Sequence, residues 1–196
     1  MTIGIFFLFI TLFLGVITIN CYISGIRYRK IFGSLAKRYN GTINFFGVLT
    51  IPVDGNQVTF SHIQSRFESQ IIVSFLELEA NSQEIGSIEN FHVYTALARR
   101  KGIHYAGMEK LLTNNTIFDK EFIVVRKNNG HRKLEGILNS SLQEKIINMR
   151  KNTDWFDISK NGSRMVIKYE KLKIENDAEL HKIFGELLEI YRAMEV

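Results

Sequence analysis

The sequence has few of the residues that interrupt or cross-link a chain. It contains one proline and one cysteine among 196 residues. A single cysteine excludes a disulfide within the chain and a cysteine-rich metal site. Scarce proline and 45% hydrophobic residues argue against long disordered segments. The 170 residues that follow residue 26 (196 − 26) are enough for one domain with its own core.

Charge is also lacking near the start of the chain. No charged side chain occurs in the 24 residues from Ile3 to Ile26. As a helix this run would be about 36 Å long, and the hydrocarbon core of a bilayer is about 30 Å thick. A cleaved signal peptide needs basic residues near its start, and residues 1–26 contain none. A lipoprotein site needs a small residue directly before the cysteine, but Asn20 precedes Cys21. We therefore expect residues 1–26 to form a retained transmembrane helix.

The basic excess lies directly after this run. Five basic residues and no acidic one occur within residues 27–38, which leaves 20 basic and 20 acidic residues in the rest of the chain. These five are Arg27, Arg29, Lys30, Lys37 and Arg38. A nucleic-acid-binding domain needs a basic surface of its own, so we expect no nucleic-acid partner. The positive-inside rule places the N-terminus outside a cell (inner) membrane and the rest of the chain in the cytoplasm.

Residues 27–39 are expected to continue the helix as a basic juxtamembrane segment. Its basic side chains would contact anionic lipid headgroups, each with a contribution of about 1 kcal/mol. The alternative is that they only determine the topology.

Small residues recur along the expected transmembrane helix and share one of its faces. They are Gly4, Thr11, Gly15, Thr18 and Gly25. Small side chains allow another helix to approach closely, so this face favours packing against another membrane subunit or a second copy of the chain. The alternative is the ordinary abundance of glycine and threonine in membrane helices.

Residues 40–196 predict one cytoplasmic α+β domain with a mostly antiparallel sheet. Asp54-Gly55 and Asn161-Gly162 are typical hairpin turns. Residues 69–79 carry apolar side chains on both faces, which predicts a central strand. Residues 91–98 predict another strand.

Two helices are expected towards the end of the domain. Residues 140–150 predict one, with Ser140 or Ser141 as its N-cap. Apolar residues at helical spacing predict a C-terminal amphipathic helix that packs on the sheet, beginning near Asn176. They are Leu180, Ile183, Phe184, Leu187, Leu188, Tyr191 and Met194.

The segment Thr116 to Val125, TIFDKEFIVV, carries a resemblance. Phe118, Asp119 and Phe122 form an F-D-x-x-F motif between the β-rich region and the helix over 140–150. With the apolar start and the basic "LAKRYNG" segment, this order resembles a loose group of uncharacterised single-pass bacterial membrane proteins. The resemblance implies a bacterial origin and an α+β domain, and it implies no activity. From the residues alone, the two phenylalanines are core residues and Asp119 is a turn or cap.

Motifs for catalysis or metal binding are lacking. The five histidines form no metal-ligand spacing, and there is no phosphate-binding glycine loop. We therefore expect no catalytic residue, metal or cofactor. One cluster mixes cationic, titratable and aromatic groups and is a candidate anion or ligand contact: His92, Arg99, Arg100, Lys101 and His104. The alternative is a solvated loop.

These features favour a non-enzymatic, membrane-anchored accessory or scaffolding subunit of a larger membrane protein complex. Its expected partners are membrane lipids and either other membrane subunits or a second copy. The alternative function is a membrane-tethered binding or sensory module for a lipid headgroup or small ligand. A tethered enzyme is the third hypothesis, and it requires a cleft with paired titratable groups.

Overall fold

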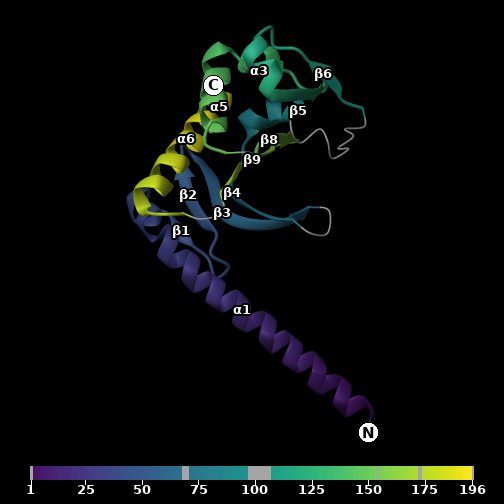
Figure 1. The fold of residues 1–196 in the computed structure, drawn as a ribbon, viewed down its shortest axis with the longest axis vertical. Helices are drawn as coiled ribbons and strands as arrows, with labels where there is room; N and C mark the ends of the chain where they lie inside the picture. The colour runs from purple at the N-terminus through teal and green to yellow at the C-terminus, as the bar shows by residue number, and fades with distance from the viewer. Residues whose placement is uncertain (1, 68–70, 97–106, 154, 172–173, 196) are drawn as a thin grey trace.

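The fold was analysed in a computed structural model (Figure 1) that describes residues 2–67, 71–96, 107–153, 155–171 and 174–195. In the first helix, the described side chains are those of residues 11–13, 15–16, 19 and 23 and those from residue 26 onward. In the third and fourth strands, they are those of residues 56–63 and 75–81.

Helices and strands alternate irregularly along the chain, as expected for an α+β protein. The first half of the chain contains α1 (Thr2–Arg38), β1 (Thr42–Ile43), β2 (Leu49–Val53), β3 (Asn56–Phe67), β4 (Ile71–Asn81), α2 (Gln83–Ser87) and β5 (Asn90–Thr95). The second half contains β6 (Glu109–Leu111), α3 (Thr116–Glu121), β7 (Phe122–Lys127), α4 (Leu134–Ile137), α5 (Ser140–Arg150), β8 (Phe156–Asn161), β9 (Arg164–Glu170) and α6 (Asp177–Glu195).

The strands form one sheet in the order β1-β2-β3-β4-β9-β8-β5-β7-β6, and every neighbouring pair is antiparallel. Asp54 and Gly55 have φ angles of 50° and 87° between β2 and β3. Positive φ at both positions gives a tight hairpin turn, as the sequence predicted. The hairpin at Asn161-Gly162 is confirmed as well, between β8 and β9. The predicted central strand is also confirmed, because β4 lies between β3 and β9.

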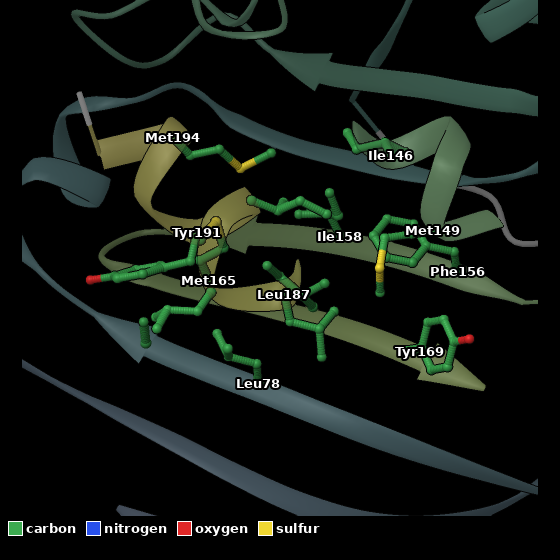
Figure 2. Close-up of a cluster of buried hydrophobic side chains, with 14 of the residues drawn as sticks. Leu78, Ile146, Met149, Phe156, Ile158, Met165, Tyr169, Leu187, Tyr191 and Met194 are labelled. Carbon is green, nitrogen blue, oxygen red and sulfur yellow. The ribbon is translucent and has the colours of Figure 1, made fainter. Parts of the chain in front are cut away.

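The core lies between one face of the sheet and the helices α5 and α6 (Figure 2). Alternate residues of β9 face the core, namely Met165, Ile167 and Tyr169, and the residues between them face the opposite side of the sheet. The seven apolar residues that predicted the last helix are all buried in α6. Hence the large antiparallel sheet and the C-terminal helix packed on it are confirmed.

Two local predictions at helix starts have different outcomes. The Asn176 side chain accepts a hydrogen bond from the Glu179 amide (2.9 Å), which confirms Asn176 as the cap of α6. The cap predicted at Ser140 or Ser141 was wrong. Asn139 accepts the Leu142 amide (3.0 Å) instead, because its backbone is extended while Ser140 already belongs to the helix.

The F-D-x-x-F segment is divided between two elements. Phe118 in α3 and Phe122 in β7 are buried and stack with their ring centroids 4.8 Å apart. The Asp119 carboxylate accepts hydrogen bonds from the amide and hydroxyl of Thr113, at 3.1 and 3.0 Å. The segment therefore has the structural role that its residues alone predicted, with Asp119 fixing the preceding turn.

The first helix is continuous through the predicted juxtamembrane segment. Its C-terminal turns pack into the domain, where Phe32 and Leu35 are fully buried. Its N-terminal half extends away from the sheet (Figure 1). Within the described part of the chain, no helix combines the length and the apolarity needed to cross a membrane. The expected transmembrane helix stays a prediction from the sequence.

Candidate functional site

The most informative region is the place where α1 meets the sheet, which we call the α1 junction: Tyr28, Phe32, Phe45, Phe46 and His62. Tyr28 and Phe32 stack one turn apart in the helix, with centroids 6.0 Å apart. Phe32 also lies 5.3 Å from the ring of Phe60 in β3. The junction thus connects the helix to the core through aromatic rings.

His62 makes a polar contact at the same place. Its Nδ1 accepts a hydrogen bond from the Tyr28 hydroxyl (2.9 Å), and its Nε2 donates to the carbonyl of Lys171 (3.3 Å). This pairing describes a neutral imidazole with its proton on Nε2. Burial lowers the pKa of His62, the carbonyl of Lys171 opposes that effect, and the positive charge of Arg27 adds to it.

We predict that acidification weakens this contact. Because the pKa of His62 is lower in the folded protein, the unfolded chain takes up a proton first as the pH falls through 6.5, the ordinary pKa of histidine. The free energy of unfolding should therefore decrease until the pH lies below the folded-state pKa. His62→Gln, which is neutral at every pH, should show a smaller decrease in urea titrations of the full chain at neutral and acidic pH. Equal pH dependence of the two proteins would contradict this prediction.

Among the described side chains in the apolar half of α1, the large apolar ones are exposed: Phe13, and five others that share one stripe. Leu12, Val16, Ile19, Ile23 and Ile26 follow the spacing of four, three, four and three residues that one helix face requires, and each is about half exposed or more. Soluble proteins seldom expose so many large apolar side chains together. A stripe of this kind needs an apolar environment or a partner.

The small-residue face lies beside this stripe. Thr11 is exposed, and a β-carbon added to Gly15 would meet no atom within 4 Å. The side chain of Thr18 and the surroundings of Gly4 and Gly25 are outside the part of the chain that the structure describes. A larger residue at position 15 is therefore compatible with the isolated chain.

The five basic residues of the predicted membrane surface occupy two levels of α1. Arg27, Arg29 and Lys30 are exposed beside Ile26. Lys37 and Arg38 are exposed about 15 Å further along the helix axis, from ten residues at about 1.5 Å each. Electrostatic interactions in physiological salt are strongly screened beyond about 8 Å. If a bilayer ended at Ile26, as the sequence predicts, only Arg27, Arg29 and Lys30 would lie within that distance of it.

Arg38 has contacts within the domain. Its Nη1 lies 3.4 Å from Nδ1 of His181 in α6, and its guanidinium lies 5.6 Å from the ring centroid of Tyr39. Arg38 therefore contributes to the packing of α1 against α6 and also adds positive charge to the surface of the domain.

The predicted anion contact is described only at His92. Arg99, Arg100, Lys101 and His104 lie outside the described residues. The Nε2 of His92 lies 2.6 Å from the carboxylate of Asp157, on the sheet face opposite α6, and both side chains are nearly buried. This nitrogen therefore contacts a carboxylate of the protein itself. The contact joins β5 to β8, so it could not be predicted from the sequence of either strand alone.

Sequence reasoning missed the two exposed phenylalanines of the α1 junction. They lie in the turn between β1 and β2, where Asn44 accepts hydrogen bonds from the amides of Phe46 and Val48, both at 3.0 Å. Gly47 has a φ of 79°. The sequence Asn44-Phe-Phe-Gly47 contains this signal, because asparagine and glycine favour turns.

In the described ranges, no group of three or more histidine, cysteine, aspartate or glutamate side chains is placed to hold a metal ion. No family model matches the chain, and neither does any curated protein or solved structure compared with it.

Proposed function

We propose that this chain is a single-pass membrane protein that acts, without catalysis, as an accessory or scaffolding subunit of a larger membrane complex. In this proposal α1 anchors the protein and the α+β domain lies in the cytoplasm. The main observation in support of this proposal is the stripe of exposed apolar side chains on the part of α1 that extends from the domain.

The anchor is supported by sequence and structure together. Ile3 to Ile26 is uncharged, and three exposed cations follow it within four residues. In a bilayer the exposed apolar stripe would be in contact with acyl chains, which removes the cost of hydrating it. Since Phe32 and Leu35 of the same helix are core residues, a rigid connection would hold the domain in a fixed orientation relative to α1.

A role in assembly is supported by the small-residue face. It lies about 100° around the helix from the apolar stripe, so lipid and a partner helix would contact different sides. Close approach at Gly15 requires open space beside it, and among the described residues no atom lies within 4 Å of a β-carbon added there. The partner in this proposal is a transmembrane helix of another subunit or of a second copy.

The test is co-purification of the full chain from native membranes in mild detergent. We predict that the protein is recovered from the membrane fraction with a stoichiometric partner, and that Gly15→Leu strongly lowers the amount of this partner. The added side chain meets nothing within the chain, and leucine is a good helix former, so folding should not change. A loss of about 1.4 kcal/mol in association would lower recovery about tenfold.

Val16→Leu is the matched control. It enlarges the neighbouring residue on the exposed apolar stripe and leaves the small-residue face unchanged. Recovery of the partner should then equal that of the unmodified chain. A protein that is monomeric and alone in membrane extracts would overturn the assembly role and favour the ligand-binding alternative. A protein absent from the membrane fraction would overturn the anchor.

A further inference from the structure

The turn between β1 and β2 presents two aromatic side chains to the surroundings. Phe46 is 66% exposed and Phe45 is 42% exposed, and their ring centroids are 5.6 Å apart in an edge-to-face arrangement. Exposure of a phenylalanine forgoes a stabilisation of about 1.5–3 kcal/mol, so a pair at a turn tip needs an explanation.

The turn is firmly built and therefore keeps the two rings exposed. The backbone amide of Asn44 donates to the carbonyl of Val48 (3.0 Å), and the amide of Gly47 donates to the carbonyl of Asn44 (3.1 Å). Together with the two bonds to the Asn44 side chain, these contacts close the loop around Phe45 and Phe46. The hydrogen bonds described here come from the backbone of the turn and from the side chain of Asn44.

The turn also lies directly against α1. A β-carbon added to Gly47 would lie 2.5 Å from the β-carbon of Tyr28, so backbone and helix are in close contact. Tyr28 follows Ile26, the last residue of the uncharged run, by two residues, which is about 3 Å along the helix axis. The exposed rings are thus held at the level where apolar residues are replaced by basic ones.

That level corresponds to the bilayer interface if α1 spans a membrane. The middle of the run from Ile3 to Ile26 lies between residues 14 and 15, and Tyr28 is about 20 Å from it along the axis. The hydrocarbon core extends about 15 Å from the midplane and the headgroup region to about 20–22 Å. Aromatic residues concentrate at this depth in membrane proteins.

The surrounding charge agrees with a bilayer. Arg27, Arg29 and Lys30 are exposed within two residues of Tyr28, the residue of α1 against which Gly47 of the turn lies. Cations beside exposed aromatic rings match an anionic lipid surface, where the rings enter the boundary of the acyl chains and the cations contact phosphate.

We propose that the β1–β2 turn inserts Phe45 and Phe46 into the headgroup–acyl boundary of an anionic bilayer, beside the point where α1 leaves it. This second contact rests on the proposed anchoring by α1. It fixes the tilt and rotation of the domain relative to the membrane. With one spanning helix alone, the domain could still turn together with that helix about the helix axis.

The test places a fluorescent reporter in the turn of the full chain. Trp155 is the only tryptophan, so Phe46→Trp in a Trp155→Phe background gives a single reporter. The protein is reconstituted into vesicles of phosphatidylcholine and phosphatidylglycerol, with or without bromine on the acyl chains near the headgroup. We expect a blue-shifted emission that loses a large part of its intensity with the brominated lipids.

Two further reporters separate the outcomes. Phe13→Trp replaces an exposed residue in the apolar half of α1, close to the expected midplane, and is measured with lipids brominated near the ends of the acyl chains. Ile117→Trp replaces an exposed residue in α3 and is measured with both kinds of brominated lipid. Quenching of Phe13→Trp without quenching of Phe46→Trp overturns the insertion of the turn and leaves the anchor intact. Absence of quenching in both overturns the anchor itself. Ile117→Trp should remain unquenched throughout.

A protein partner on the turn would give another result. Blue-shifted emission of Phe46→Trp without bromine quenching means that protein covers the turn, and this overturns insertion into lipid. Trp155 packs against Phe75, with ring centroids 6.1 Å apart. Should Trp155→Phe prevent folding, Trp155 is retained and the difference between the spectra with and without Phe46→Trp gives the same measurement.

Discussion

Replacing Phe32 with alanine is expected to lower the free energy of unfolding by about 3–5 kcal/mol. Phe32 has no exposed surface, and its ring contacts Tyr28 in the same helix and Phe60 in β3. Phe60 in turn lies 5.1 Å from Phe184 of α6, so the ring is one member of a chain of aromatic contacts through three elements. Alanine would leave a cavity that a continuous helix cannot easily close. Small domains have only about 5–15 kcal/mol of stability, so this is a large part of the total.

Urea unfolding of the full chain in detergent, followed by circular dichroism, measures the effect. Lys30→Ala is the control, because Lys30 is exposed on the same helix and its removal should change the stability by less than about 0.5 kcal/mol. Similar small losses for both variants would show that α1 is not packed in the domain. That result would also remove the rigid connection on which the orientation of the domain depends.

The second large effect is expected at Glu89, the most deeply buried carboxylate of the described residues, with no exposed surface. One of its oxygens accepts hydrogen bonds from the Leu134 amide (2.9 Å) and from the Arg126 guanidinium (3.3 Å). The other lies 3.9 Å from the ammonium of Lys133. Glu89 thus joins the start of α4 to β7.

Lys160 is a second buried charge near this carboxylate. It is 3% exposed, and its ammonium donates to the Ile88 carbonyl and to the side chain of Asn90. Burial lowers the pKa of Lys160, and the negative charge of Glu89 opposes this shift. Removing the carboxylate would leave the ammonium buried without that compensation.

We therefore predict that Glu89→Ala costs about 3–5 kcal/mol of folding free energy. Glu135→Ala is the matched control. Glu135 also pairs with Arg126, but its side chain is 47% exposed, so its loss should cost no more than about 1 kcal/mol. Urea unfolding of both variants compares them directly. If the two losses were equal, burial would not be what makes Glu89 important.

Local features of the chain were predictable because they depend on residues close in sequence. Asp54-Gly55 and Asn161-Gly162 adopt turns since glycine tolerates positive φ without steric cost. The spacing of apolar residues in α6 predicted its buried face, because a helix places every third or fourth residue on one side. The continuation of α1 through the basic segment was predictable because Ile31, Phe32 and Leu35 share one helix face there.

Features that join distant segments were not predictable. The sequence placed His92 with the cations of residues 99–101, whereas the pairing of β5 with β8 brings it to Asp157, 65 residues away. Glu89 was not singled out at all. Its burial arises because β5, β7 and α4 converge on it, and a single sequence does not specify which strands become neighbours.

The sequence by itself determined the apolar start of α1, the basic residues that follow it, the two glycine-containing hairpin turns and the helices α5 and α6, because these depend on composition and short-range spacing. Only the tertiary structure decided that Phe32 belongs to the core and that the turn carrying Phe45 and Phe46 lies against Tyr28 through Gly47. The reason is that long-range strand pairing and helix packing set these contacts, and their free energy is gained only when the whole sheet has formed.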